Sequence, residues 1–252
     1  MLGSGSSGNA TLVNAGGCKI LVDSGLSLRQ LLLRCEMAGE SLEGLKAILV
    51  THEHADHVNG LGVLARRMDV PVYLTRGTLE ALPAGVGRLP RVSIIEAGES
   101  FALNGMGVSS FSVSHDAADP VSFVIESAGT KLGIAGDLGH PSELVKQRLA
   151  GSHGLILESN YCPDMLRKGS YPPMVQQRIR GRHGHLSNQD MCSLLSDLLH
   201  EALRVVVLVH ISEENNTPEL AREMASGAIK GHPALIHVAG REKPTPVFEL
   251  RS

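Results

Sequence analysis

Short runs of aliphatic residues recur along the chain and predict a protein that is rich in β-strands. Most runs consist of valine, isoleucine and leucine and are bounded by glycine, proline or aspartate, as strands usually are. The predicted strands are Thr11–Ala15, Lys19–Asp23, Ala47–Val50, Val70–Thr75, Val92–Glu96, Gly107–Ser114, Val121–Ser127, Lys131–Ala135, Gly154–Leu157, Arg204–Val209 and Leu235–Val238.

Other segments repeat apolar residues every three or four positions, which predicts amphipathic helices. Asn188 is a suitable N-cap, and Pro218 occupies a first-turn position after Thr217. The helices alternate with strands, which predicts sheets with helices on their outer faces, and no repeat or linker interrupts residues 10 to 250. We therefore expect a single α/β domain over residues 1–252. The predicted helices are Ser27–Ala38, Gly60–Met68, Ser142–Ala150, Asn188–Leu203 and Thr217–Ile229.

The bulk composition excludes several classes of protein. With 252 residues, 42% of them hydrophobic, and a net charge of -3, the chain has enough apolar surface for a core and no global basic field. Its four cysteines form no C-x-x-C pair, which disfavours a thiolate zinc site. The sequence contains no signal peptide and no apolar run of about 18 residues, so we expect a soluble cytoplasmic protein without a membrane partner.

One stretch, residues 165 to 189, is strongly basic although the chain as a whole is not. It contains five cations and no acidic residue, and an isolated charge run of this kind is most simply a solvated surface. Only 3% of the residues are aromatic and none is tryptophan, which argues against an aromatic platform for single strands. The cations are Arg167, Lys168, Arg178, Arg180 and Arg182.

The segment AILVTHEHADHVNG carries the densest candidate chemistry. A predicted strand ends at Val50, and His52, His54, Asp56 and His57 follow within a few residues. Imidazole and carboxylate are ligands for zinc, manganese and iron. An extended chain would project His52 and His54 to the same side, and a turn would direct Asp56 and His57 to a second ion. The alternative is a histidine-rich surface loop without metal.

Three later strand ends offer further ligands. His115 follows a strand in SVSHDAADP, Asp137 follows one in LGIAGDLGH, and His210 ends one in VVVLVHISEENN. Each residue alone could be an ordinary turn residue. Together, and in this order after H-x-H-x-D-H, they predict a metal site.

These motifs resemble the metallo-β-lactamase superfamily over essentially the whole chain. The resemblance implies a four-layer αβ/βα sandwich with a dinuclear site. It implies that His52, His54, His115 and Asp137 hold one ion, and that Asp56, His57, Asp137 and His210 hold the other. Two divalent ions about 3.5–4 Å apart can share a hydroxide that attacks a phosphate or carbonyl. Five histidines and two aspartates suit zinc, with manganese or iron as alternatives, and Asp56 could also accept a proton from the water.

Four segments resemble a narrower group, YycJ/WalJ: SGSSGNATLV, ESNYCPDMLRKGSYP, RIRGRHGHLSN and HISEENNTPELA. That resemblance implies a 5′-to-3′ DNA exonuclease, a kind of enzyme used in DNA repair, with DNA as its partner. His185 in GHLSN is then the candidate for binding the scissile phosphate or protonating the leaving oxygen. Its alternative role is a helix-entry histidine bonded to local backbone. The remaining substrate-contact candidates are Ser7, Gly8, Asn9, Asn160, Ser187 and Asn188.

The glycine-serine stretch SGSSGN at residues 4–9 has the composition of a linker. Because it resembles the first-hairpin loop of this group, we expect it to belong to the site, where successive backbone N–H groups could form an anion-binding nest. A first strand normally precedes this loop, but only Met1–Gly3 do so here, so either the given start is too late or the usual first edge strand is absent.

Two other functions remain open from the sequence. A lactonase, thioesterase or similar small-molecule hydrolase could use the same scaffold, without any need for the basic stretch. A metal-binding regulatory protein without turnover is the alternative from another class, although the complete ligand set argues against it. The native metal, DNA against RNA, exonuclease against endonuclease cleavage, and the oligomeric state are not determined.

Overall fold

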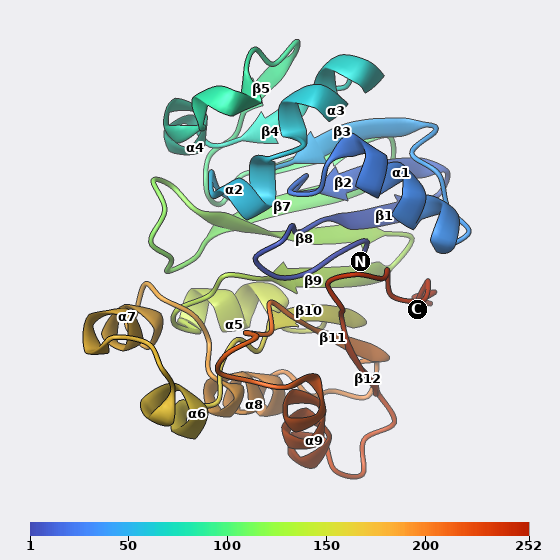
Figure 1. Ribbon diagram of the computed structural model, residues 1–252. Helices are drawn as coiled ribbons and strands as arrows, with labels where there is room; N and C mark the ends of the chain where they lie inside the picture. The colour runs from blue at the N-terminus through green and yellow to red at the C-terminus, as the bar shows by residue number, and fades with distance from the viewer. Residues whose placement is uncertain (252) are drawn as a thin grey trace. The chain divides into compact units, whose positions relative to one another are not determined.

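The computed structural model describes residues 1–251 and divides the chain into two compact units (Figure 1). The first unit contains residues 1–112, 117–121 and 239–247, and the second contains residues 113–116, 122–238 and those from 248 onward. Among the described residues, no helix combines the length and apolar character needed to cross a bilayer.

The first unit is built on a mixed sheet with the strand order β1-β2-β3-β4-β5. β1 (Thr11–Ala15) and β2 (Cys18–Val22) form an antiparallel hairpin. β3 (Leu45–Leu49), β4 (Val72–Leu74) and β5 (Val92–Ile94) then add in parallel. The carboxyl ends of β2, β3 and β4 therefore lie along one edge of this sheet.

Helices and loops of the first unit bury aliphatic side chains against this sheet. Leu31 of α1 and Leu61 and Leu64 of α3 belong to the same buried cluster as Ile48 and Val72 of the strands. This packing gives both helices the apolar stripe that the sequence periodicity predicts. The other elements of the unit are the helices and the hairpin: α1 (Leu28–Met37), α2 (Ala55–Val58), α3 (Leu61–Met68), α4 (Arg76–Ala81), η1 (Ala84–Val86), β6 (Ser100–Leu103) and β7 (Met106–Ser112).

The second unit contains a sheet in which the strands follow the order β12-β11-β10-β9-β8. β9 (Thr130–Ala135), β10 (Gly154–Glu158), β11 (Val205–Val209) and β12 (Leu235–Val238) run parallel, whereas β8 (Val121–Ser127) pairs antiparallel with β9. Every residue of β10 and β11 is buried, as expected for parallel strands covered on both faces. The helices are α5 (Glu143–Leu149), α6 (Pro163–Lys168), α7 (Pro173–Ile179), α8 (Asn188–Asp197) and α9 (Pro218–Ala228).

The structure confirms the predicted strands and helices and corrects their details. Helix α8 ends at Asp197, well before the predicted Leu203, and its N-cap is Ser187 rather than Asn188, because the Ser187 hydroxyl accepts a hydrogen bond from the Asp190 amide. Thr217 caps α9 with Pro218 in the first turn, as predicted. The elements that sequence periodicity missed are short: α2, α4, η1, α6, α7 and β6. Such elements span too few residues to establish a period.

Two glycines inside helices test the packing, because alanine is expected to change the free energy of unfolding in opposite directions at the two positions. A Cβ at Gly62 of α3 would lie 1.8 Å from the Val86 carbonyl oxygen, whereas one at Gly227 of α9 meets nothing within 4 Å. We expect Gly62→Ala to lower the free energy of unfolding by about 1–3 kcal/mol through overpacking. Gly227→Ala should raise it by about 0.5–1 kcal/mol because alanine is the better helix former.

Urea denaturation of both variants and the unchanged chain measures these differences. A stable Gly62→Ala protein with an unaltered midpoint would contradict the close approach of α3 to the Val86 loop. The Gly227→Ala variant controls for the general effect of adding a methyl group to a helix.

Candidate metal centre

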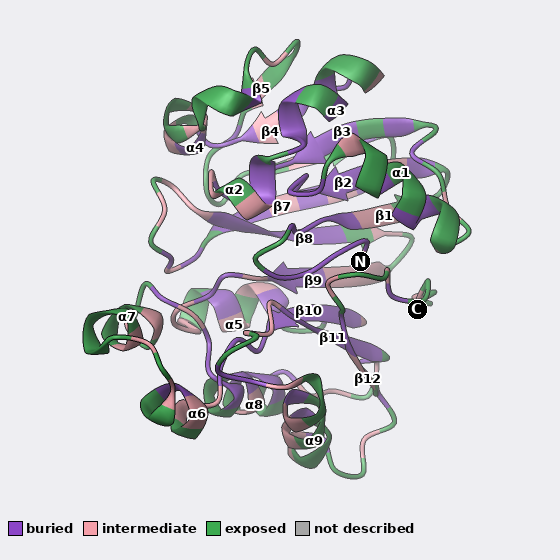
Figure 2. Cartoon of the chain, in the orientation of Figure 1, coloured by how far each residue is buried: buried purple, intermediate pink, exposed green. Residues whose placement is uncertain are grey.

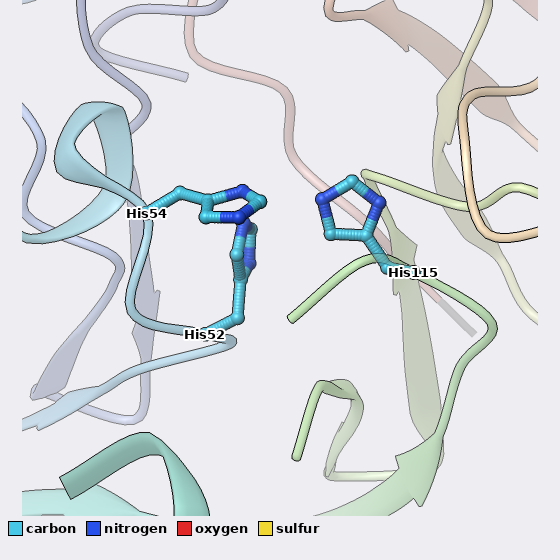
Figure 3. A group of neighbouring side chains, drawn as sticks. All are labelled: His52, His54 and His115. Carbon is cyan, nitrogen blue, oxygen red and sulfur yellow. The ribbon is translucent and has the colours of Figure 1, made fainter. Parts of the chain in front are cut away.

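The histidines of the first unit gather where β3 ends. The ring centroids of His52 and His54 are 4.6 Å apart, and those of His52 and His57 are 4.1 Å apart. His52 and His57 are almost completely buried. Figure 3 shows the rings of His52 and His54 projecting from the loop after β3, and His115 on the loop after β7. The neighbouring rings of His52 and His54 agree with the prediction that both side chains project to one side.

Asp23, at the end of β2, orients His57. Its Oδ2 lies 2.8 Å from Nδ1 of His57, and its Oδ1 accepts a hydrogen bond from the backbone N–H of Thr51. A carboxylate at Nδ1 keeps the imidazole hydrogen on that nitrogen and leaves Nε2 as the ligand atom. Asp23 was not among the residues predicted for the site, although it is the last residue of a predicted strand.

The SGSSGN loop is fastened to the segment that carries Asp56. The Asn9 backbone N–H donates to the Asp56 carbonyl (2.7 Å), and Asn9 Nδ2 donates to Asp56 Oδ2 (3.0 Å). The orientation of the amide is determined by the Gly5 N–H, which donates to Asn9 Oδ1. Asn9 Nδ2 also lies 2.9 Å from His57 Nε2. The stretch is therefore joined by hydrogen bonds to the segment that carries Asp56 and His57, and its membership of a functional site stays a prediction.

The substrate-binding role expected of this loop stays a prediction. Ser7 is exposed and Gly8 is buried. The side chain of Asn9 is only 7% exposed and is engaged with Asp56 and His57. What the structure shows for Asn9 is contact with two of the predicted ligands.

A second group of possible ligands forms within the second unit, at the carboxyl ends of its parallel strands. Asp137 follows β9, Glu158 ends β10, His210 follows β11, and His185 precedes α8. One possible ligand atom from each of these four residues lies within 4.8 Å of the others. His210 Nδ1 is 2.6 Å from Asp137 Oδ1. Two of the predicted ligands therefore meet in this group, together with the predicted catalytic histidine.

Glu158 organises this group and was not recognised from the sequence. Its Oε1 lies 2.7 Å from Nδ1 of His185 and 3.0 Å from Nδ1 of His210. Its Oε2 accepts the backbone N–H groups of Leu138 and Leu186. The sequence shows only a charged residue at the end of an apolar strand, which is ordinary; that Glu158 is fully buried is known from the structure alone.

The charges in this group support one another. Burial favours the neutral carboxyl of Glu158, but the adjacent His185 and His210 outweigh burial and lower its pKa. Burial also favours the neutral imidazole of His210, but Asp137 and Glu158 outweigh it and raise its pKa. A cation is thus well accommodated here, and a divalent ion would supply the positive charge that a proton otherwise provides.

His115 has the properties of a neutral ligand in the same unit. It is 4% exposed, and burial lowers its pKa. Its Nδ1 lies 3.1 Å from the Gly184 carbonyl oxygen, which places the imidazole hydrogen on Nδ1. The lone pair of Nε2 is then available to bind a metal ion. Its ring centroid is 5.3 Å from that of His185.

The other predicted substrate contacts are committed to internal hydrogen bonds. Asn160 Nδ2 donates to the His210 carbonyl, the Ser187 hydroxyl donates to Asp190, and the buried Asn188 exchanges hydrogen bonds with Asn216. These bonds hold the chain on either side of His185 and His210. A direct contact with substrate stays a prediction for all three residues.

Comparison with known proteins places this arrangement in a family. A family model described as a beta-lactamase superfamily domain matches residues 19–211. The donors in both units are imidazoles and carboxylates, which fit zinc, manganese or iron. The chain belongs to the metallo-β-lactamase superfamily and is a metal-dependent hydrolase of that fold, with histidine and aspartate clusters consistent with a dinuclear site.

Two curated relatives are similar over most of their length. The chain is 35% identical to the exodeoxyribonuclease YycJ of Bacillus anthracis, covering 98% of this chain and 97% of that protein. It is 34% identical to the exodeoxyribonuclease WalJ of Streptococcus pneumoniae serotype 2 strain D39, covering 88% of this chain and 84% of that one. The predicted resemblance to the YycJ/WalJ group is thereby confirmed.

Solved structures support the fold. Zinc-bound PqqB from Methylobacterium extorquens has a TM-score of 0.72 at 21% identity, covering 95% of this chain and 96% of that one. The metallo-beta-lactamase fold protein YhfI from Bacillus subtilis has a TM-score of 0.71 at 14% identity, covering 94% of both chains. At these identities the likeness concerns architecture alone.

The contact between Asn9 and Asp56 leads to a prediction about metal binding. Asn9→Ala removes the amide that donates to the Asp56 carboxylate, so this side chain should become less ordered. We expect weaker divalent-metal binding, by about 10-fold, as is typical when an outer partner of a ligand is lost. Asn14→Ala, an exposed position on β1, is the matched control. Competition with a chromogenic chelator measures both, and equal affinities would contradict the prediction.

Glu158→Gln should disturb the second group of ligands without changing its volume. The two backbone donors at Oε2 would retain the amide oxygen, which turns the amide NH₂ toward Nδ1 of both histidines. A donor would then face Nδ1 of both rings, which favours the tautomers with the hydrogen on Nε2; for His210, the predicted ligand, this occupies the nitrogen left over from the contact with Glu158. We expect metal affinity to fall by about 10–100-fold.

The matched control is Glu143→Gln, whose side chain is exposed on α5. Metal content after dialysis against graded chelator separates the two variants. A Glu158→Gln chain that retains the full metal content of the unchanged chain would show that Glu158 does not orient the ligands.

Proposed function

We propose that this chain is a metal-dependent phosphodiesterase that removes nucleotides from the 5′ ends of DNA. The observation that carries this proposal is the 35% identity, over 98% of the chain, to a protein named an exodeoxyribonuclease. The superfamily fold alone does not select a substrate, because one fold hosts many activities. The basic segment before His185 is consistent with a polyanionic substrate.

The proposal keeps the dinuclear metal centre that the sequence predicts. His52, His54, His115 and Asp137 would hold one ion, and Asp56, His57, Asp137 and His210 would hold the other. Zinc suits these donors, with manganese or iron as alternatives. When bound, such ions supply an activated water at neutral pH and neutralise charge on the phosphate.

Residues of the chain supply the proton transfers in this proposal. Asp56 accepts a proton from the attacking water, with its carboxylate oriented by the amide of Asn9. His185 donates a proton to the leaving oxygen. Burial disfavours the charged form of His185, but Glu158 outweighs burial and raises its pKa, which favours the protonated imidazole that this role needs. Glu158 is therefore a positioning residue that acts through His185.

The exposed arginines of the 165–189 segment would contact phosphates on either side of the scissile bond. Arg178, Arg180 and Arg182 are exposed, and Arg182 precedes His185 by three residues. Phosphate contacts of this kind are independent of sequence and weaken as salt concentration rises, with a slope of about 0.7–0.9 per contact on logarithmic axes.

Digestion of end-labelled single- and double-stranded DNA in the presence of manganese or zinc tests the proposal. We expect stepwise loss from 5′ ends, inhibition by salt, and a rate for Asp137→Ala lower by about 100-fold or more, because this residue is the proposed bridge between the ions. Intact DNA together with hydrolysis of a lactone or thioester would replace the nuclease assignment with a small-molecule hydrolase.

A pair of neighbouring histidines tests the proton donor separately. His185→Ala should lower kcat by about 10²–10⁴-fold with less change in KM, because a general acid acts in the transition state. His183→Ala, two residues earlier and exposed, should leave both parameters unchanged. Equal effects of the two substitutions would remove His185 from the reaction.

A further inference from the structure

Helix α7 (Pro173–Ile179) of the second unit is exposed along most of its length, and Figure 2 shows this in green. None of its residues is buried, whereas the adjacent α6 buries Leu166. Met174 is 81% exposed and its neighbour Val175 is 39% exposed. Two adjacent apolar side chains in water gain free energy when a ligand covers them.

The charge around α7 indicates what kind of ligand this is. Arg178, Arg180 and Arg182 are exposed, and residues 165 to 189 contain no acidic residue. One of these arginines forms an ion pair, in which Arg178 Nε lies 3.2 Å from Asp116 Oδ2. A strand of DNA combines phosphates for the arginines with flat, weakly polar base faces for the apolar pair.

Helix α7 is tied firmly to the proposed catalytic histidine. The His185 N–H donates to the Ile179 carbonyl at 2.8 Å, and the Gly184 N–H donates to the Gly181 carbonyl. The backbone also packs too closely here for any side chain at two glycines. A Cβ at Gly184 would lie 2.1 Å from the Ile179 carbonyl oxygen, and one at Gly139 would lie 2.3 Å from the Arg182 carbonyl oxygen. A ligand on α7 is therefore held in a defined position relative to His185.

We propose that α7 is the docking surface for the unpaired end of a DNA strand, with Met174 and Val175 against the base faces and the arginines on the phosphates. This inference rests on the proposed function, because it takes DNA as the substrate. The inference adds that binding depends on contacts with the bases near the cleaved bond as well as on contacts with the phosphates. Base faces are accessible only when the strand end is unpaired, so single-stranded ends are the preferred ligand.

The test combines changes in the protein with changes in the DNA. Met174→Ser with Val175→Ser removes the apolar contact at exposed positions that do not support folding. The probe is a fluorescent 5′-phosphorylated 12-nucleotide strand with phosphorothioate linkages, either complete or with one abasic site at each of the first four positions. Fluorescence anisotropy with the metal-loaded protein gives the affinities. Met37→Ser, which is 50% exposed on α1, is the control.

We expect the double substitution to weaken binding of the complete strand by about tenfold, roughly the effect of uncovering two methylene groups. An abasic site at one of the first positions should weaken binding to the unchanged protein by a similar factor and leave the double variant unaffected. Equal losses for both proteins at every abasic position, or unaltered affinity of the double variant, would overturn the inference.

The result also distinguishes the inference from the proposed function. If the unchanged, metal-loaded chain neither binds these strands nor cleaves unmodified DNA in the digestion assay, the nuclease proposal itself fails and the role of α7 fails with it. If the unchanged chain cleaves DNA while the abasic sites and the substitutions act independently, only the role of α7 is wrong.

Discussion

The second unit depends on one buried carboxylate. Glu158 has no exposed surface, and a buried charge without partners would cost several kcal/mol. Four donors compensate it: the imidazoles of His185 and His210 and the backbone N–H groups of Leu138 and Leu186. Because these donors lie on three separate segments, the need to satisfy one carboxylate brings the ends of β9, β10 and β11 and the entry to α8 together.

The first unit uses the same principle at Asp23. This carboxylate is 5% exposed and joins the end of β2 to Thr51 and His57 after β3. In each unit, therefore, a carboxylate that is not among the predicted ligands determines which nitrogen of a histidine is available. Contacts with these carboxylates therefore orient the predicted ligands His57 and His210 before any ion binds.

Backbone strain marks the same positions. Asp23, Asp137 and His210 have φ angles of 61°, 46° and 57°, which residues other than glycine adopt only at a cost of about 1 kcal/mol or more. Glycine would relieve this cost but would remove the side chain. The strained turn aims each side chain away from its strand at the carboxyl edge of the sheet, where parallel strands place functional groups.

The amino-acid sequence by itself determined most of the regular structure and supplied the candidate ligands. Strand-length apolar runs and helical periodicity reflect burial on one or two faces, and H-x-H-x-D-H is a local pattern that needs no distant contact. Tertiary structure alone decided the roles of Glu158, Asp23 and Asn9. Their chemistry arises from partners 27, 34 and 47 positions away along the chain, and no local pattern distinguishes them from residues that merely end a strand or a turn.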